Sequence, residues 1–207
     1  EHNGKTYKVV YAKDGKCWLD RDLGASQVAT SKTDSLSFGS LFQWGRLSDG
    51  HELMDWSSGT PINGNTSVLS TTDSPGHSLF ITNTGGTYDW RNPHNNSLWQ
   101  GVSGINNPCP TGFKIPTGGP DSEWLALTTA ENIIDSDSAF ASTLKIPLPG
   151  KRRNLNGTIQ TNLVTSSFYW TSSQNITNTR AYYMNINGPT HSVSMFVYGH
   201  YVRCIKD

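Results

Sequence analysis

Few residues of this sequence have the types and spacing that catalysis requires. The chain has no Gly-x-Ser-x-Gly turn for a nucleophilic serine, no phosphate-binding Gly-x-x-x-x-Gly-Lys-Ser/Thr and no dinucleotide-binding Gly-x-Gly-x-x-Gly. His51-Glu52 lacks the second histidine of a His-Glu-x-x-His zinc site. Asp89, Asp121 and Glu123 could supply the paired carboxylates of a glycosidase only if the fold brought them together. We therefore expect a protein that is not an enzyme.

Oxygen-bearing side chains make calcium the candidate metal. Calcium takes about six to eight oxygen ligands, and the sequence is rich in Asp, Asn, Gln and glycine-containing loops. The candidate ligands are Asp49, Asp89 and Asn107, with Gln100 and Asn106 as further candidates. The chain has no EF-hand loop, and no Cys/His cluster suits a structural zinc ion. Since Asn and Asp also bond to their own backbone in turns, a turn role is the favoured alternative at any single position.

Tryptophan and tyrosine are the candidate contact residues of a binding surface. The chain contains seven Trp and eight Tyr, and both types combine apolar area with a hydrogen-bonding group. Four tryptophans lie in patterned segments and are expected in the core: Trp18, Trp44, Trp124 and Trp170. The expected ligand-binding residues are Trp90, Trp99, Arg91, Gln100, Tyr183 and Tyr198. For the two tyrosines, packing against neighbouring strands is the alternative.

The elements that must position these residues are mainly strands. Alternating apolar residues predict strands near both ends of the chain, at residues 5–11, 17–19, 168–172, 181–186, 192–198 and 201–205. Asp14-Gly15 is typical of a hairpin turn between the first two strands. A helix is expected at residues 121–132, capped by Asp121 or Thr117, and a second at 37–47. The last quarter of the chain is expected to form an antiparallel meander.

The segment from about residue 49 to 107 is predicted to be a long loop lobe. It is rich in Gly, Ser, Asn and Thr, and so long a loop is uncommon in a compact domain unless it is functional or anchored. It also contains three tryptophans, which a disordered linker rarely carries. We therefore expect this lobe to be ordered by its aromatic residues.

Composition restricts the class of protein. The 207 residues suit one domain, residues 1–207, and the formal net charge of +0 argues against a nucleic-acid partner. Charged residues make up only 15% of the chain, which is typical of an extracellular protein. No apolar run is long enough to span a membrane, so we expect no membrane insertion. The first residues do not resemble a signal peptide, which favours a mature or excised piece of a larger protein.

Six segments carry a family resemblance. In order along the chain they are CWLDRDLGA (17–25), LFQWGR (41–46), NPCPTGFKIPT followed by EW (107–117 and 123–124), LKIPLPGKR (144–152), YWTSS (169–173) and YVRCIKD (201–207). Together they resemble the sequence blocks of the Fibrobacter succinogenes major paralogous domain family. This resemblance covers the chain from about Gly4 to Asp207, and six blocks in the right order are more specific than any one alone.

The resemblance implies an α+β fold of the C-type-lectin-like kind. Such a fold has an antiparallel sheet with paired terminal strands, one or two helices and a long loop lobe that carries the ligand site. The family's cysteines fall at Cys109 and Cys204, which implies a disulfide between them. Cys17 is extra, so it is either a free thiol or the true partner of one of the other two. Lys151 replaces the aromatic residue that the family has at this position.

The leading hypothesis is a secreted ligand-binding or adhesion module of a bacterial surface protein. Its partner would be a peptide or glycan on another cell surface, with calcium as a candidate bridge, and the domain is expected to be monomeric. One alternative is an enzyme related to the formylglycine-generating oxidases, which share the fold and use cysteine chemistry. The other is a structural spacer without a ligand site. One free thiol would favour the binding module, and three would favour the enzyme.

Overall fold

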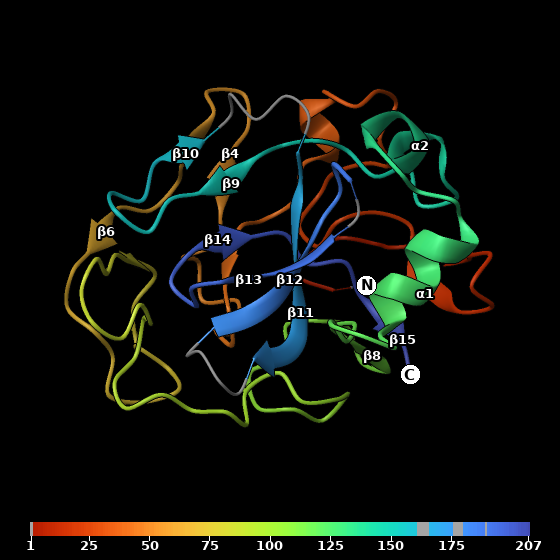
Figure 1. The fold of residues 1–207 in the computed structure, drawn as a ribbon. Helices are drawn as coiled ribbons and strands as arrows, with labels where there is room; N and C mark the ends of the chain where they lie inside the picture. The colour runs from red at the N-terminus through yellow and green to blue at the C-terminus, as the bar shows by residue number, and fades with distance from the viewer. Residues whose placement is uncertain (1, 161–165, 176–179, 189) are drawn as a thin grey trace.

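Short strands and two helices make up the computed structural model, which describes residues 2–160, 166–175, 180–188 and 190–207. The helices are α1 (Glu123–Ala130) and α2 (Ser136–Ala141), and a 3-10 turn covers Ser35–Ser37. The pairing of the strands is mostly antiparallel. This arrangement fits the predicted α+β class (Figure 1).

One four-stranded sheet joins the two ends of the chain. Its order is β1 (Val9–Tyr11), β2 (Cys17–Leu19), β15 (Ile205–Lys206) and β8 (Phe113–Lys114). Trp18 of β2 lies opposite both Val10 and Ile205. The expected hairpin between β1 and β2 is present, and Gly15 takes the positive φ of 79° that its turn requires. The expectation that the terminal strands pair with each other is thus confirmed.

The remaining strands form two larger sheets and two small pairs. A four-stranded sheet has the order β10 (Ile159–Gln160), β9 (Lys151–Arg152), β14 (Gly199–His200) and β3 (Phe42–Gln43), and an antiparallel meander joins β11 (Phe168–Asn175), β12 (Arg180–Asn185) and β13 (Thr190–Ser194). The small pairs are β4 (Met54–Asp55) with β5 (Thr60–Pro61), and β6 (Asn65–Thr66) with β7 (Phe80–Ile81). The meander lies between the helices on one side and β6, β9 and β10 on the other (Figure 1). The third meander strand ends at Ser194, so Tyr198 lies beyond it rather than within it.

A close backbone contact fixes the second sheet. Gly199 of β14 lies opposite Arg152 of β9, and a Cβ atom added at Gly199 would come within 2.8 Å of the Cβ atom of Arg152. The glycine therefore allows β14 to lie close to β9. This contact places His200 and Lys151 on neighbouring strands.

Helix α1 is confirmed, although its cap differs from the expectation. The cap is Ser122, whose hydroxyl accepts a hydrogen bond from the Leu125 N–H. Asp121 adopts a positive φ of 56° instead, and the Thr117 hydroxyl accepts from the Glu123 N–H. A serine cap closes the first turn of the helix in the same way as the expected residues would have done.

The helix expected at residues 37–47 is wrong. The segment instead holds the end of the 3-10 turn and β3, which pairs with β14. Phe42, Trp44 and Leu41 are all buried, and a segment buried on several sides has no clear helical periodicity. Helix α2 was not expected. Its N-terminal signal is Asp135, which accepts from the Ser138 N–H in a capping box.

The loop lobe at 49–107 is ordered by buried side chains. Its regular structure is limited to β4 to β7, but Phe80, Trp90, Leu98 and Trp99 are all buried. The guanidinium of Arg46 is also buried, and it donates hydrogen bonds to the His77 and Leu79 carbonyls at 2.8 and 3.0 Å. Apolar packing and a buried cation therefore stabilise a region that has little sheet or helix.

Candidate ligand-binding site

The two loop tryptophans lie in the core. Trp90 and Trp99 are both 0% exposed. The Trp90 indole N–H donates to the Trp44 carbonyl, and the Trp99 ring packs 5.7 Å from the Trp44 ring, centroid to centroid. The prediction that Trp90 and Trp99 contact ligand is wrong for this conformation, because neither ring has a free face. Their role is to anchor the loop lobe.

The side chains of Arg91 and Gln100 contact neighbouring segments of the protein. The Arg91 side chain is only 11% exposed, and its Nε atom lies 3.4 Å from the Asp73 carboxylate. The amide of Gln100 donates to the Leu98 and Ser172 carbonyls at 2.9 Å each. Both N–H groups of the Gln100 amide are therefore used within the protein, and the Arg91 guanidinium is mostly buried in an ion pair with Asp73.

The three predicted calcium ligands do not gather in one place. Asp49 contacts Arg46 and His51, whereas Asp89 contacts His94. The Asn107 amide donates to two backbone carbonyls, and its oxygen accepts from the Cys109 N–H. Each candidate is thus used within its own segment, as the alternative role in turns and loops requires. These residues do not fit a shared calcium site.

Asp49 belongs to a different cluster of possible metal ligands. One ligand atom each of Asp49, His51 and Glu52 lies within 4.8 Å of the others, and this is the only such group found in the described part of the chain. The Gln43 N–H, however, donates to His51 Nε2 at 3.0 Å. Neutral His51 must therefore carry its proton on Nδ1, which donates to Asp49 at 2.7 Å. Since a protonated nitrogen cannot ligate a metal, the cluster fits a hydrogen-bond network better than a metal centre.

Asp89 forms a network with a histidine that the sequence did not single out. His94 Nδ1 bonds to the Asp89 carboxylate, and His94 Nε2 lies 3.0 Å from the Gln174 side-chain oxygen. Burial alone would lower the pKa of His94, but the hydrogen bonds to Asp89 and Gln174 and the negative charge of Asp89 outweigh it and raise this pKa. When it is protonated, His94 donates to both side chains and joins the loop lobe to β11.

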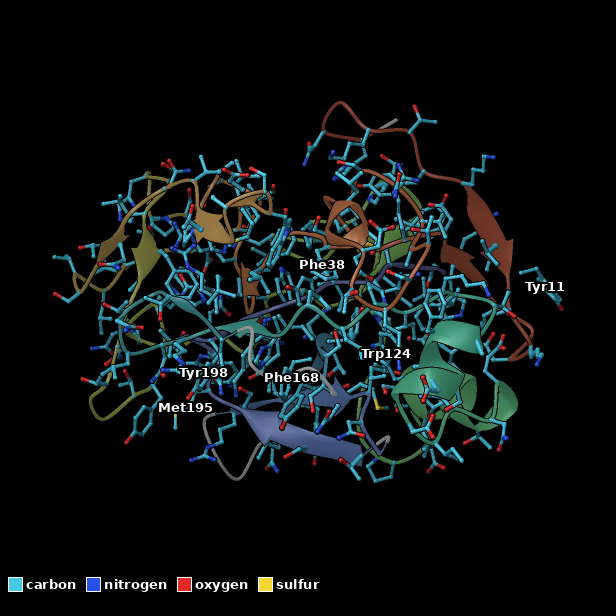
Figure 2. The ribbon with its side chains drawn as sticks, turned by 90° about the horizontal axis from the view of Figure 1, so that it is seen from above. Tyr11, Phe38, Trp124, Phe168, Met195 and Tyr198 are labelled. Carbon is cyan, nitrogen blue, oxygen red and sulfur yellow. A yellow bond between two sulfur atoms is a disulfide. The ribbon has the colours of Figure 1, made fainter. Side chains whose placement is uncertain are left out.

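The two predicted tyrosines do come together, in an aromatic cluster around His200. The rings of Tyr183 and Tyr198 lie 5.4 and 5.8 Å from the His200 ring, and Phe168 lies at 5.5 Å. Tyr183 and Tyr198 are partly exposed, whereas His200 is buried. Phe168 and Tyr198 lie on the same side of the molecule, away from Phe38 (Figure 2). Strands β11, β12 and β14 and the residues before β14 thus build one partly open aromatic surface.

His200 is held in its neutral form beneath this surface. Burial, followed by the positive charge of Lys151, lowers the pKa of His200 well below its usual value. Its Nδ1 lies 3.1 Å from the Gly199 carbonyl, and its Nε2 lies 3.0 Å from the Ser194 hydroxyl. Neutral His200 can donate from Nδ1 and accept at Nε2, so both ring nitrogens have partners.

Lys151 places a positive charge at the centre of the aromatic cluster. Its Nζ atom lies 4.7 Å from the centroid of the Phe168 ring and 4.8 Å from that of Tyr198. Burial, followed by the charge of Arg153, lowers the pKa of Lys151. Among the described residues, Lys151 forms no salt bridge. The sequence analysis noted this lysine only as a departure from a family pattern, because its aromatic neighbours lie far away in sequence.

The cysteines pair as the resemblance implied. Cys109 and Cys204 form a disulfide with a Cα–Cα distance of 5.9 Å, and Cys17 is a free, partly buried thiol. The disulfide links the segment before β8 to the one before β15, so it closes the sheet of the terminal strands.

Searches for a helix that could cross a membrane and for known relatives both gave negative results. No helix among the described residues has the length and apolar character of a membrane span. A scan against protein-family models, a search of curated proteins and a search of solved structures found no match to this chain.

Proposed function

We propose that this chain is a non-catalytic, extracellular ligand-binding module with a role in adhesion, and that its α+β architecture is of the C-type-lectin-like kind. The observation that supports this function best is the ammonium group of Lys151, which lies between two aromatic rings without a carboxylate partner among the described residues. The ligand is a peptide or glycan that carries a negative charge. Its place is the aromatic cluster of Lys151, Phe168, Tyr183 and Tyr198.

The chemistry of this cluster suits an anionic ligand with a flat or apolar part. Two ring faces stabilise the ammonium of Lys151, but no carboxylate in the described part of the chain neutralises its positive charge. A carboxylate or sulfate of the ligand would form a charge-assisted hydrogen bond with it. The partly exposed rings of Tyr183 and Tyr198 would contact the apolar part of the ligand, and their hydroxyls can hydrogen-bond to it. Calcium has no part in this proposal.

The cysteines support both the location and the absence of catalysis. A disulfide between Cys109 and Cys204 is compatible with an oxidising, extracellular environment. An enzyme of the formylglycine-generating kind would need cysteine chemistry, and two of the three cysteines are already used in this bond. A pure spacer domain would have no reason to hold, among partly exposed tyrosines, a lysine that forms no ion pair with any described residue.

The test is a binding screen of the chain on arrays of acidic and neutral glycans and peptides. For the strongest ligand found, we expect Lys151→Gln to weaken binding at least tenfold and Tyr198→Ala to weaken it several-fold. The affinity of Tyr198→Phe should lie between those of Tyr198→Ala and the unchanged chain. Lys114→Gln is the matched control, because Lys114 is already paired with Glu123 and Asp207. Equal affinity of the Lys151→Gln and Lys114→Gln variants would show that the ligand binds elsewhere.

A further inference from the structure

A cavity of about 430 Å³, separate from the aromatic cluster, lies beside Arg152, the second residue of β9. Successive side chains of a strand point to opposite faces, so Arg152 points away from the face of Lys151. The cavity is lined by Arg152 together with the polar residues Thr60, Asn63, Asn65 and Asn156 and the apolar Ile159. Its volume lies in the range of small-molecule sites.

Among the residues that the structure describes, Arg152 is the only charged one that lines this cavity, and it is 1% exposed. Its guanidinium donates to the carbonyls of Gly157, His51 and Asn63 at 2.8, 2.7 and 3.3 Å. It also packs on the Phe80 ring, with its Cζ atom 4.1 Å from the ring centroid. A guanidinium has five N–H groups, so two of them have no acceptor among the described residues and can bond to a ligand.

The positive charge of Arg152 has no counter-charge among the described residues. Burial, followed by the positive charge of Arg46, lowers the pKa of Arg152 to about 10. The other two deeply buried arginines are each paired with a carboxylate: Arg46 with Asp49 at 2.8 Å and Arg203 with Asp22 at 2.7 Å. A buried charge without a partner is costly. The cavity is therefore a place where an anion would be favourable.

We propose that this cavity is a second binding site, in which Arg152 binds the carboxylate of an acidic saccharide. The amide groups of Asn63 and Asn65 each donate to a backbone carbonyl, and their side-chain oxygens accept no hydrogen bond from a described residue. Those oxygens can accept from sugar hydroxyls, while Ile159 contacts the apolar face of the ring. The proposal is independent of the aromatic cluster, since its residues are different.

A saccharide fits this cavity better than an acidic peptide. Peptides that bind to a sheet edge need several consecutive free backbone groups, and the strands nearest the cavity, β5, β6 and β10, have two residues each. Amide side chains beside small apolar surfaces instead suit hydroxyl groups and C–H faces. Ile62 lines both this cavity and a neighbouring one of about 470 Å³, so a second sugar unit could extend in that direction.

The test measures binding of trigalacturonate to the 207-residue chain by calorimetry at low salt, with its methyl ester as a neutral control of the same shape. We expect the acid to bind and the ester to bind at least tenfold more weakly. Equal binding of acid and ester, or no binding of the acid at millimolar concentration, would overturn the proposal. A hexaglutamate peptide is the third probe, and binding of this peptide in place of trigalacturonate would overturn the assignment to a saccharide.

Two sets of variants locate the site. Arg152→Gln should abolish binding of trigalacturonate, but this buried change can also disturb folding. Thr60→Glu places a negative charge at an exposed position of the rim, whereas Thr60→Gln has the same size without the charge. We expect Thr60→Glu to weaken binding at least fivefold relative to Thr60→Gln. Equal affinities of these two variants for trigalacturonate would contradict the site. Loss of trigalacturonate binding in Lys151→Gln, but not in Thr60→Glu, would place the saccharide at the aromatic cluster.

Discussion

Two buried arginines of this molecule differ in how their charge is balanced. Arg203 and Arg152 are each 1% exposed. The Nε of Arg203 donates to one oxygen of Asp22 at 2.8 Å, and its Nη2 lies 2.7 Å from the same oxygen. The other oxygen of Asp22 accepts from the Tyr169 hydroxyl at 2.9 Å. Arg152 bonds to three backbone carbonyls and, among the described residues, to no carboxylate. The charge of Arg203 is therefore neutralised within the protein, whereas no described residue neutralises the charge of Arg152.

This difference separates a structural role from a binding role. A buried ion pair whose hydrogen bonds are satisfied holds its elements together, and loss of one partner leaves a costly unpaired charge. A buried arginine bound only to carbonyls also ties loops together, but its charge favours an anion from outside. The lowered pKa of Arg152 agrees with an unneutralised charge, because it means that the folded state disfavours the charged guanidinium. The resulting loss of folding stability is present in full at every pH below about 10.

The largest effect is expected from Asp22→Asn. This change leaves Arg203 buried without a counter-charge and weakens the hydrogen bond from Tyr169. We expect the free energy of unfolding to fall by about 3–5 kcal/mol. Urea unfolding at neutral pH, followed by tryptophan fluorescence, measures it.

The control for this prediction is an exposed ion pair. Asp137 pairs with Lys32, and its side chain is 80% exposed. Asp137→Asn should change the free energy of unfolding by at most about 1 kcal/mol. If Asp22→Asn were as mild as Asp137→Asn, the pair of Arg203 and Asp22 would not be the structural element described above.

A smaller loss is expected from Arg152→Met. The change leaves three carbonyls without their donor, at a cost of about 1–3 kcal/mol for each one that stays dry. Gly157 and Asn63 line the cavity, so water can replace the donor at their carbonyls, and the change also removes an uncompensated buried charge. The fall in the free energy of unfolding should therefore be clearly smaller than for Asp22→Asn. Urea unfolding of both variants in the same buffer makes the comparison. A loss as large as that of Asp22→Asn would mean that Arg152 is as much a part of the fold as Arg203.

The sequence predicted the strands and core of the molecule better than the residues of its candidate binding sites. Local alternation and the Asp14-Gly15 turn were enough to place β1 and β2, and the four patterned tryptophans are all buried. The environment of Arg152 was not predictable, because its carbonyl partners at His51 and Asn63 lie about a hundred residues away in sequence. The burial of Trp90 and Trp99 was missed for the same reason. Their loop has no periodicity, so only tertiary contacts place the two rings.

The smallest expected change in stability concerns His94, which forms an ion pair with Asp89 only while the histidine is protonated. Since the pKa of His94 is raised in the folded state, its contribution to stability is fully present below the unfolded value near 6.5 and is lost as the pH rises through the folded pKa. We expect the unchanged chain to lose about 1 kcal/mol more than His94→Gln between pH 5.5 and 8, in urea unfolding at each pH. His77→Gln is the control, because the His77 ring accepts from the Leu79 N–H and contacts no carboxylate among the described residues. Parallel pH profiles of the unchanged chain and His94→Gln would show that the pair of Asp89 and His94 contributes no charge-dependent stability, in contrast to the buried pair of Arg203 and Asp22.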